Sequence, residues 1–479
     1  MIKLYDTLQR KKEPLKPLLG EEVSLYVCGI TPYSKAHLGH ALHALIFDML
    51  RRHLEWSGLR VRHIQNFTDI DDKIIDRANE LNIPPNELAT SNTTDYLQSL
   101  RLLNILPATE YPRATSEMPN IIQVIEGLIE KNYAYPSNGD VYYHVRNKQD
   151  YGKLSGHDIN DLRSGARIPQ GETKKDPLDF ALWKKAKPGE PYWESPWGEG
   201  RPGWHIECSA MAISALGNRI DIHGGGADLI FPHHENEIAQ SEGFTGESPF
   251  ARFWIHNALL QLGDDKMSKS SGNLVSIDEI LQNTTADGLR LFVASSHYRS
   301  PLNYTPAALE AASTGAERLR AAATLQELSP VGEPLPINDE RMKFRTALND
   351  DLNTPRAIAV LFDLARAINR AHDNKKPFKE AQNLLCELAN VLGFTLADPK
   401  TIKHELGPFQ ALLKEYDENT AQKENLEDIL GALLEIRESL REEKKWAAED
   451  KAFDTGKERY ERKEDRLERR ELKTKQRLS

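Results

Sequence analysis

The sequence predicts an α/β protein in which a parallel-sheet domain is split by an insertion and followed by an all-α C-terminal region. Residues 23–28 form a predicted strand, 38–56 a helix and 61–66 a second strand. This order makes a βαβ unit, which predicts a parallel sheet. Between about 111 and 203 the pattern changes to a helical stretch, one short strand and a segment rich in Pro, Gly and Trp. From about residue 307 onward the chain is predicted to be helical.

Each element rests on a local pattern. Apolar residues at helical spacing predict the first helix. Residues 219–223 form another predicted strand, which enters the glycines at 224–226. The next helix is expected to begin near Pro232. Ser276 and Glu279 form a predicted capping box at the start of a later helix.

Composition bounds the class of protein. The chain has 479 residues, 39% of them hydrophobic, and a formal net charge of −10. This length predicts about three domains. Its apolar runs fall short of the roughly 20 residues that span a bilayer, and the N-terminus lacks the apolar segment of a secretory signal, so we expect a cytoplasmic protein. The negative charge argues against a protein that binds nucleic acid nonspecifically over its whole surface. It does not exclude RNA binding through a local basic face.

Three cysteines, Cys28, Cys208 and Cys386, fit a reducing compartment. There, cysteine more often serves metal binding or catalysis than disulfide formation. Cys386 lies among leucines in a predicted helix and is expected in the core. The charged stretch 457–479 is predicted to be a solvated helix or a disordered tail.

Two histidines stand where the first helix begins. Helix N-termini present free N–H groups and a partial positive charge to anions. His37 and His40 are therefore candidates to bind phosphate oxygens and to stabilise a transition state. Gly39 would let a nucleotide approach the backbone. The alternative is a pair of half-buried histidines at an ordinary helix start.

A second phosphate-handling motif, Lys-Met-Ser-Lys-Ser, spans residues 266–270. Lys266 and Lys269 would bring two positive charges against a triphosphate. They would act mainly in the transition state, in which pyrophosphate leaves. A solvated loop is the alternative for two nearby lysines. The complete string is far more specific than its parts.

His233 and Glu237 are four residues apart, so on a helix they share one face and suit two ligands of one metal. Cys28 and Cys208 would add two thiolates to a four-coordinate zinc. Spacing alone does not pair cysteines so far apart, and two buried cysteines beside a charged helix start are the alternative. The rival ligands are His223 and His234.

Further candidates border the same region. Trp204 would wall a small substrate pocket, although a lone tryptophan is more often core. Thr68 follows the second strand at its carboxyl end, where ligands usually bind, and would hydrogen-bond the substrate. The carboxylates at 71–72 are expected to cap the next helix. Gly226 and Asp228 would let a base or ribose lie on bare backbone, or they form a tight turn.

A nucleotide site beside a thiol-binding metal indicates activation of a thiol substrate by ATP. These residues resemble the cysteinyl-tRNA synthetases, a class I aminoacyl-tRNA synthetase family, over nearly the whole chain to about residue 450. Residues 37–40 match the first signature of that class and 266–270 the second. Residues 203–211 and 221–237 resemble the family's own signatures, and 349–355 resemble the opening of its helical domain.

The resemblance implies a Rossmann-type catalytic domain and ATP-dependent ligation of L-cysteine to tRNA(Cys) through cysteinyl-adenylate. Magnesium would accompany the ATP. One zinc per chain would select the substrate thiol. Its histidine ligand would be His233 in preference to His234. The expected partners are tRNA(Cys), L-cysteine and ATP, without a membrane, and the family resemblance favours a monomer.

The resemblance also implies roles for individual residues. Those expected are His37, His40, Lys266 and Lys269 for catalysis; Thr31, His37, Gly39, His40, Gly226, Asp228 and Lys269 for ATP; Gly29, Thr68, Trp204 and His223 for the substrate; and Cys28, Cys208, His233 and Glu237 for the metal. The expected domains are 1–110 and 204–250 (the two halves of the catalytic domain), 111–203 (a connective-peptide insertion), 251–306 (the lysine-motif loop and a stem-contact region), 307–400 (a helical anticodon-side domain) and 401–479 (a helical region with a charged tail).

The likeness has departures. Residues 28–32, Cys-Gly-Ile-Thr-Pro, also resemble a related ligase that joins cysteine to an amino-sugar inositol. That ligase lacks the glutamate matching Glu237 and the long helical C-terminus. After about residue 448 the charged sequence replaces the family's usual ending, which puts the anticodon contact in question. The rival functions are therefore the amino-sugar ligase and a zinc-dependent RNA-binding protein with an inactive nucleotide fold.

Overall fold

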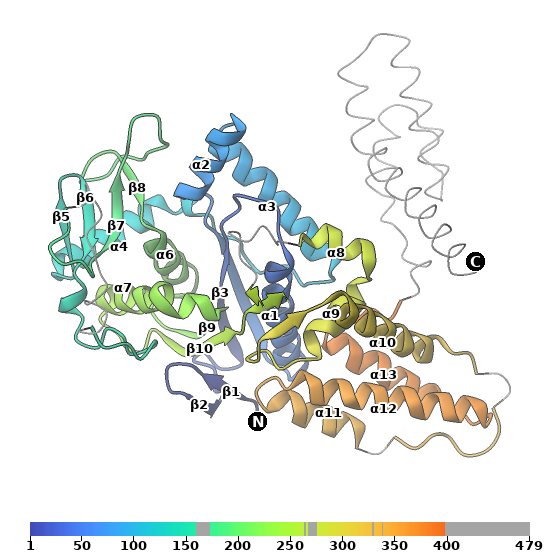
Figure 1. The fold of residues 1–479 in the computed structure, drawn as a ribbon. Coiled ribbons are helices and arrows are strands. Elements are labelled where there is room, and N and C mark those ends of the chain that lie inside the picture. Colours follow the sequence, from blue (N-terminus) through green and yellow to red (C-terminus); the bar gives the residue numbers. More distant parts are fainter. Residues whose placement is uncertain (160–172, 263–264, 267–274, 328–329, 338, 398–479) are drawn as a thin grey trace, which may run out of the picture. The chain divides into compact units, whose positions relative to one another are not determined.

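The computed structural model describes residues 1–159, 173–262, 265–266, 275–327, 330–337 and 339–397 (Figure 1). Residues Met1–Leu396 form one compact unit. A parallel sheet organises this unit, with strand order β10-β9-β3-β4. Its strands are β3 (Glu22–Ile30), β4 (Arg60–Phe67), β9 (Ile220–Gly226) and β10 (Ala251–Asn257).

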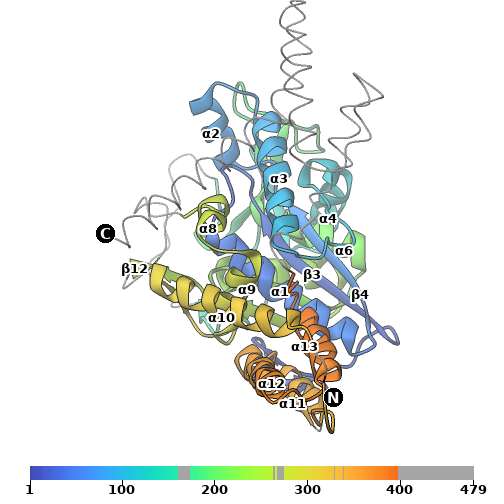
Figure 2. The ribbon, with the colours of Figure 1, turned by 90° about the vertical axis from the view of Figure 1, so that its right-hand side faces the viewer.

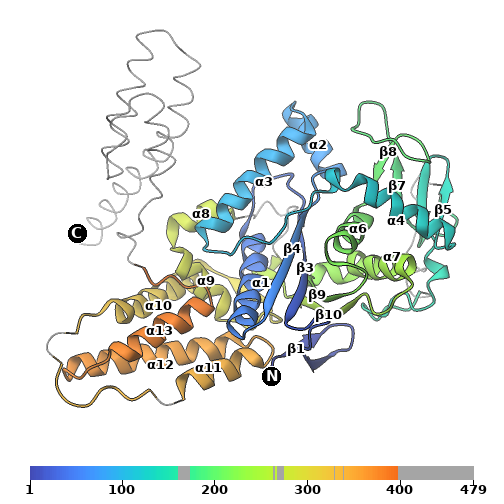
Figure 3. The ribbon, with the colours of Figure 1, turned by 180° about the vertical axis from the view of Figure 1, so that it is seen from behind.

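The predicted βαβ unit is confirmed. Helix α1 (Leu38–Trp56) joins β3 to its parallel neighbour β4 and packs against the sheet (Figure 3). Residues 44–50 are buried without a gap, because the sheet packs on one side of α1 and helices from later in the chain pack on the others. Because helices cover both faces, β3 is buried along most of its length.

A second, antiparallel sheet lies in the part of the chain expected to be an insertion. Its order is β5-β6-β7-β8, with β5 (Ala134–Ser137), β6 (Asp140–Tyr143), β7 (Phe180–Lys185) and β8 (Gly200–Pro202). The helices before and after it are α2 (Asp72–Leu81), α3 (Pro85–Leu102), α4 (Met118–Glu130), α6 (Trp204–Leu216) and α7 (Glu235–Thr245). Short turns of helix are η1 (Ala114–Ser116), η2 (Val145–Asn147), η3 (Ala227–Leu229) and η4 (Ile230–His234).

The remaining described chain is mostly helical, as expected. Its helices are α8 (Ile277–Asn283), α9 (Ala286–Ala294), α10 (Pro306–Thr324), α11 (Glu340–Asn349), α12 (Thr354–Asp373) and α13 (Lys379–Val391). Figure 2 shows α10 to α13 packed together. Small sheets pair β1 (Lys3–Asp6) with β2 (Lys11–Pro14), and β11 (Leu260–Leu262) with β12 (Asp265–Lys266) and β13 (Leu302–Tyr304). None of the described helices combines the length and apolarity needed to cross a bilayer.

Several local predictions can be compared with the structure. Ser276 and Glu279 form the predicted reciprocal capping box of α8. Asp71 caps α2 as expected, by accepting from the Lys73 amide. Asp72 pairs instead with Lys184 and Arg201. The domain boundaries stay predictions, and the charged tail lies outside the described residues.

The expectation for Cys386 was wrong, because the cysteine is exposed. Leu384, Leu385 and Leu388 are buried on α13. Successive residues of a helix are rotated by about 100°, so the position after Leu385 points away from that stripe.

Candidate active site

The carboxyl ends of the central strands converge on one region, as expected for an open parallel sheet. Alternation along β3 decides which face each side chain occupies: Leu25 and Val27 join the core that contains α1, whereas Tyr26 and Cys28 join the core that contains α6. Cys28 therefore faces Cys208 on α6.

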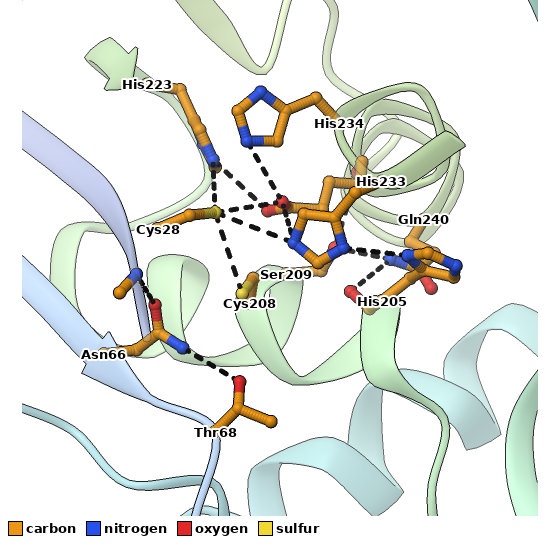
Figure 4. A network of polar contacts seen from close by, with 12 residues as sticks. Cys28, Asn66, Thr68, His205, Cys208, Ser209, His223, His233, His234 and Gln240 are labelled. Atoms are coloured by element: carbon orange, nitrogen blue, oxygen red, sulfur yellow. Dashed lines mark hydrogen bonds and ion pairs between the residues drawn. The ribbon is translucent and has the colours of Figure 1, made fainter. Parts of the chain in front are cut away.

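Figure 4 shows the cluster that results. The Cys28 sulfur lies 3.8 Å from the Cys208 sulfur, 3.7 Å from His233 Nε2 and 3.4 Å from Glu237 Oε1. His233 Nε2 and Glu237 Oε1 are 3.0 Å apart. All four side chains are buried. Three distant segments thus bring two thiols, one imidazole and one carboxylate together.

The rival imidazoles also reach this cluster. His223 Nε2 is 3.6 Å from the Cys28 sulfur and 3.4 Å from Glu237 Oε2. Among the described residues, the ligand atoms of Cys28, His233, His234 and Glu237 all lie within 4.8 Å of one another, a set that includes His234 and leaves Cys208 out. These distances do not decide between Cys208 and His234. The ligand set expected from the sequence, which contains Cys208 and omits His234, therefore stays a prediction.

The ionisable groups are strongly perturbed. The hydrogen bond from the Cys28 thiol lowers the pKa of Cys208 to about 6, while burial raises the pKa of Cys28. Burial opposes a charge on Glu237, yet the imidazoles of His223 and His233 hold its pKa well below the usual value. Burial likewise opposes a charge on His233, but Glu237 and Cys208 raise its pKa to about 10. Cys208 and Glu237 are therefore held as thiolate and carboxylate, the forms that bind metals, whereas Cys28 and His233 keep protons that a bound metal would displace.

The cluster fits a zinc ion by its donor chemistry. Zinc is bound by thiolate sulfur, imidazole nitrogen and carboxylate oxygen, and all three are present. His234 Nε2 is buried and has no hydrogen-bond partner among the described residues, and Glu237 Oε2 is buried with only its 3.4 Å ion-pair contact to His223 Nε2. A bound ion or an ordered water would satisfy buried polar atoms of this kind.

The two histidines at the start of α1 form a reciprocal capping box. His37 Nδ1 accepts from the Gly39 amide at 3.1 Å, and His40 Nδ1 accepts from the His37 amide at 3.3 Å. Their rings stack with centroids 3.7 Å apart. Because both Nδ1 atoms accept hydrogen bonds, neutral rings carry their protons on Nε2. The pair thus stands at a helix N-terminus, where anions bind.

The expected substrate residues lie around the cluster. Trp204 stacks on His233 with ring centroids 4.4 Å apart. The Gly29 amide donates to Asn66 Oδ1 at 2.8 Å, and Asn66 Nδ2 lies 3.5 Å from Thr68 Oγ1. A Cβ on Gly29 would meet the Asn66 carbonyl oxygen at 1.6 Å, so only glycine fits there.

The remaining expected residues have these positions. Thr31 follows β3, and its carbonyl accepts from the Tyr33 amide. Gly226 ends β9 and Asp228 lies in the short turn η3. Lys266 ends β12, whereas Lys269 lies outside the described residues. The structure therefore does not test whether the second lysine motif meets the first.

Sequence reasoning missed several histidines around the cluster. His205 Nδ1 lies 2.8 Å from His233 Nδ1, and His256 Nε2 lies 2.8 Å from His234 Nδ1. His43 bridges Asn257 Oδ1 and the Cys28 carbonyl oxygen. The one available signal was position: His43 is one helical turn beyond His40, and His256 is near the carboxyl end of β10.

Fold and site together define a class I aminoacyl-tRNA synthetase. Residues 14–314 match the family model described as "tRNA synthetases class I (C) catalytic domain", and residues 343–397 match the DALR domain. Solved structures support the fold alone: a methionyl-tRNA synthetase of Mycobacterium tuberculosis (TM-score 0.55, 14% identity, 78% of this chain and 88% of that one) and a LeuRS of Agrobacterium radiobacter (TM-score 0.56, 11% identity, 80% and 84%).

The chain belongs to the cysteine–tRNA ligase family. It is 52% identical over 417 residues to the cysteine–tRNA ligase of Dehalococcoides mccartyi strain 195, covering 86% of this chain and 91% of that protein. It is 46% identical over 458 residues to that of Thermococcus gammatolerans, covering 93% of each. The resemblance found from the sequence is thereby confirmed.

Proposed function

We propose that this chain ligates L-cysteine to tRNA(Cys) in two steps. The cysteine carboxylate attacks the α-phosphorus of ATP, the bond to the pyrophosphate leaving group breaks, and cysteinyl-adenylate forms. A hydroxyl of the 3′-terminal adenosine of the tRNA then attacks the activated carbonyl, and AMP leaves. The buried cluster of Cys28, Cys208, His233 and Glu237 beside the sheet that carries α1 is the observation on which the proposal depends.

In this proposal His37 and His40 bind phosphate oxygens through Nε2–H groups, with their rings held by the capping box. Lys266 and Lys269 balance charge on the departing pyrophosphate, and magnesium accompanies the ATP. Thr31, Gly39, Gly226 and Asp228 surround the nucleotide. Thr68, Trp204, His223 and the backbone at Gly29 border the amino acid.

Cys28, Cys208, His233 and Glu237 would hold zinc, which would supply a soft Lewis acid for the substrate thiolate. Serine differs from cysteine by one atom, and a pocket that recognises shape alone discriminates such pairs weakly. The protein's own part is to place the four donors in one buried cluster, in which Cys208 and Glu237 are deprotonated and Cys28 and His233 would give up their protons to a metal. Thiolate is a far better zinc ligand than a serine hydroxyl, so no editing site is required.

The DALR domain, at 343–397, is a tRNA-binding domain, and we assign the helices from α10 to α13 to the tRNA. The cytoplasmic location and the monomeric state stay predictions.

Cysteine-dependent exchange of labelled pyrophosphate into ATP tests the proposal. We expect exchange with cysteine and at least about 100-fold less with serine, followed by cysteinylation of tRNA(Cys). Equal exchange with serine would contradict the proposal that the metal selects the thiol of the substrate. Transfer of cysteine to glucosaminyl-inositol in place of tRNA would favour the amino-sugar ligase.

A further inference from the structure

A hollow of about 550 Å³ opens beside the first histidine motif. The loop before α1 forms one wall with Tyr33, Lys35 and His37, and α2 forms the other with Lys73 and Arg77. His37 therefore belongs both to the hollow and to the expected phosphate site. The hollow borders the reaction centre without being part of the metal cluster.

Lys73 links this hollow to the cluster. Its ammonium lies 5.7 Å from the centre of the Tyr33 ring and 5.8 Å from that of Trp204, and Trp204 in turn stacks on His233. The neighbouring Asp72 fixes the start of α2 through its ion pairs with Lys184 and Arg201 on the antiparallel sheet. Lys73 is thereby held between Tyr33 of the hollow and Trp204, the ring that stacks on His233 of the cluster.

The charges in the hollow favour an anion. Arg77 is neutralised by Glu80 at 2.6 Å, and one further carboxylate, Asp76, lines the wall. Lys35 and Lys73 are both exposed. Two exposed ammonium groups beside a half-buried aromatic ring are the combination with which proteins bind single-stranded nucleic acid: cations follow the backbone and a ring stacks on a base.

We propose that this hollow receives the unpaired 3′ end of the tRNA, with Lys35 and Lys73 contacting its phosphates and Tyr33 contacting a base. The proposal rests on the proposed function, because the second step needs the terminal hydroxyl delivered to the activated carboxyl. A single strand has unstacked bases, so one of them is free to reach the Tyr33 ring while the lysines contact the phosphates.

The test compares Lys35→Gln, Lys73→Gln and the double variant with Lys11→Gln, an exposed lysine on β2 that does not line the hollow. We expect each single change to raise the KM for tRNA about tenfold, and the slope of log KM against log salt to fall by about 0.7 for each phosphate that the variant no longer binds. Lys11→Gln should behave as the unchanged protein. Cysteine-dependent pyrophosphate exchange without tRNA should keep its rate in all variants.

A second substrate locates the contact on the RNA. A tRNA(Cys) without its three terminal unpaired nucleotides should bind the unchanged protein and the lysine variants equally. If the variants bind this truncated tRNA more weakly, the lysines contact the paired stem and the proposal is wrong. A loss of exchange in the variants would assign them to ATP and also overturn it. Absence of exchange in the unchanged protein would instead contradict the proposed function itself.

Discussion

Cys28 and Cys208 are separated by 180 positions in the sequence, yet their sulfur atoms lie 3.8 Å apart. One is near the end of a buried strand and the other is on the helix that covers that strand. The hydrogen bond between them lowers the pKa of Cys208 to about 6. A thiolate is therefore available at neutral pH in a site that also contains imidazole and carboxylate.

Replacing Cys208 by serine should remove bound zinc and reduce cysteine-dependent exchange by at least about 100-fold, because a hydroxyl does not ionise to replace the thiolate. The substitution deletes one buried sulfur without adding bulk, so the far-UV circular dichroism should remain. Zinc content and exchange rate are the measurements. Cys386→Ser, at an exposed cysteine, is the matched control. A zinc-free Cys208→Ser protein with full exchange would contradict the assignment.

His233→Asn should lose more zinc affinity than His234→Asn. His233 Nε2 is 3.0 Å from Glu237 Oε1, whereas His234 Nε2 is 3.9 Å from it. The other ring nitrogen of His234 contacts His256. Competition with a chelator gives both affinities, with a difference of at least about tenfold expected. Equal losses would place His234 among the ligands.

Gly29→Ala should destabilise the protein by about 1–3 kcal/mol and depress exchange, since the new Cβ would overlap the Asn66 carbonyl oxygen and force β3 away from β4. The comparison is Gly58→Ala, where the backbone has φ of +91° and a Cβ would meet nothing within 4 Å. That change should cost about 1 kcal/mol from backbone strain alone. Chemical denaturation of both variants measures the difference. An unchanged exchange rate in Gly29→Ala would show that the strands adjust freely.

His63 should make the fold sensitive to acid. Its ring nitrogens are buried without a partner among the described residues, and burial, followed by the charge of Arg51, lowers its pKa to about 3. In the unfolded chain the pKa of a histidine is about 6.5. Below that pH the unfolded chain therefore binds a proton at this residue, whereas His63 stays neutral in the folded protein. Stability is therefore lost as the pH falls below about 6.5 towards 3, by about 2 kcal/mol at pH 5.

The variant His63→Leu removes the contribution of this histidine to the pH dependence of stability. Its free energy of unfolding should fall less than that of the unchanged protein between pH 8 and pH 5, the difference being about 2 kcal/mol. At pH 8 the histidine is neutral in both states, so the comparison there isolates the packing change. Parallel pH curves for the two proteins would show that His63 is not responsible.

Local patterns in the sequence were enough for the elements that carry the site. The βαβ unit, the capping box at Ser276 and the i, i+4 relation of His233 with Glu237 all depend on residues close together in the chain, and the structure contains each of them. The family resemblance rested on short motifs as well, and it is confirmed over most of the chain.

Tertiary structure alone decided what surrounds those motifs. Alternation along β3 and the position of α6 bring Cys28 to Cys208, and no short-range pattern specifies that meeting. The same holds for the imidazoles of His205 and His256, which reach the cluster from other elements. The sequence by itself determined the types of chemical group and their local spacing. Packing between distant segments decided which of them share one buried cluster, because burial and hydrogen bonding there depend on how the whole sheet is covered.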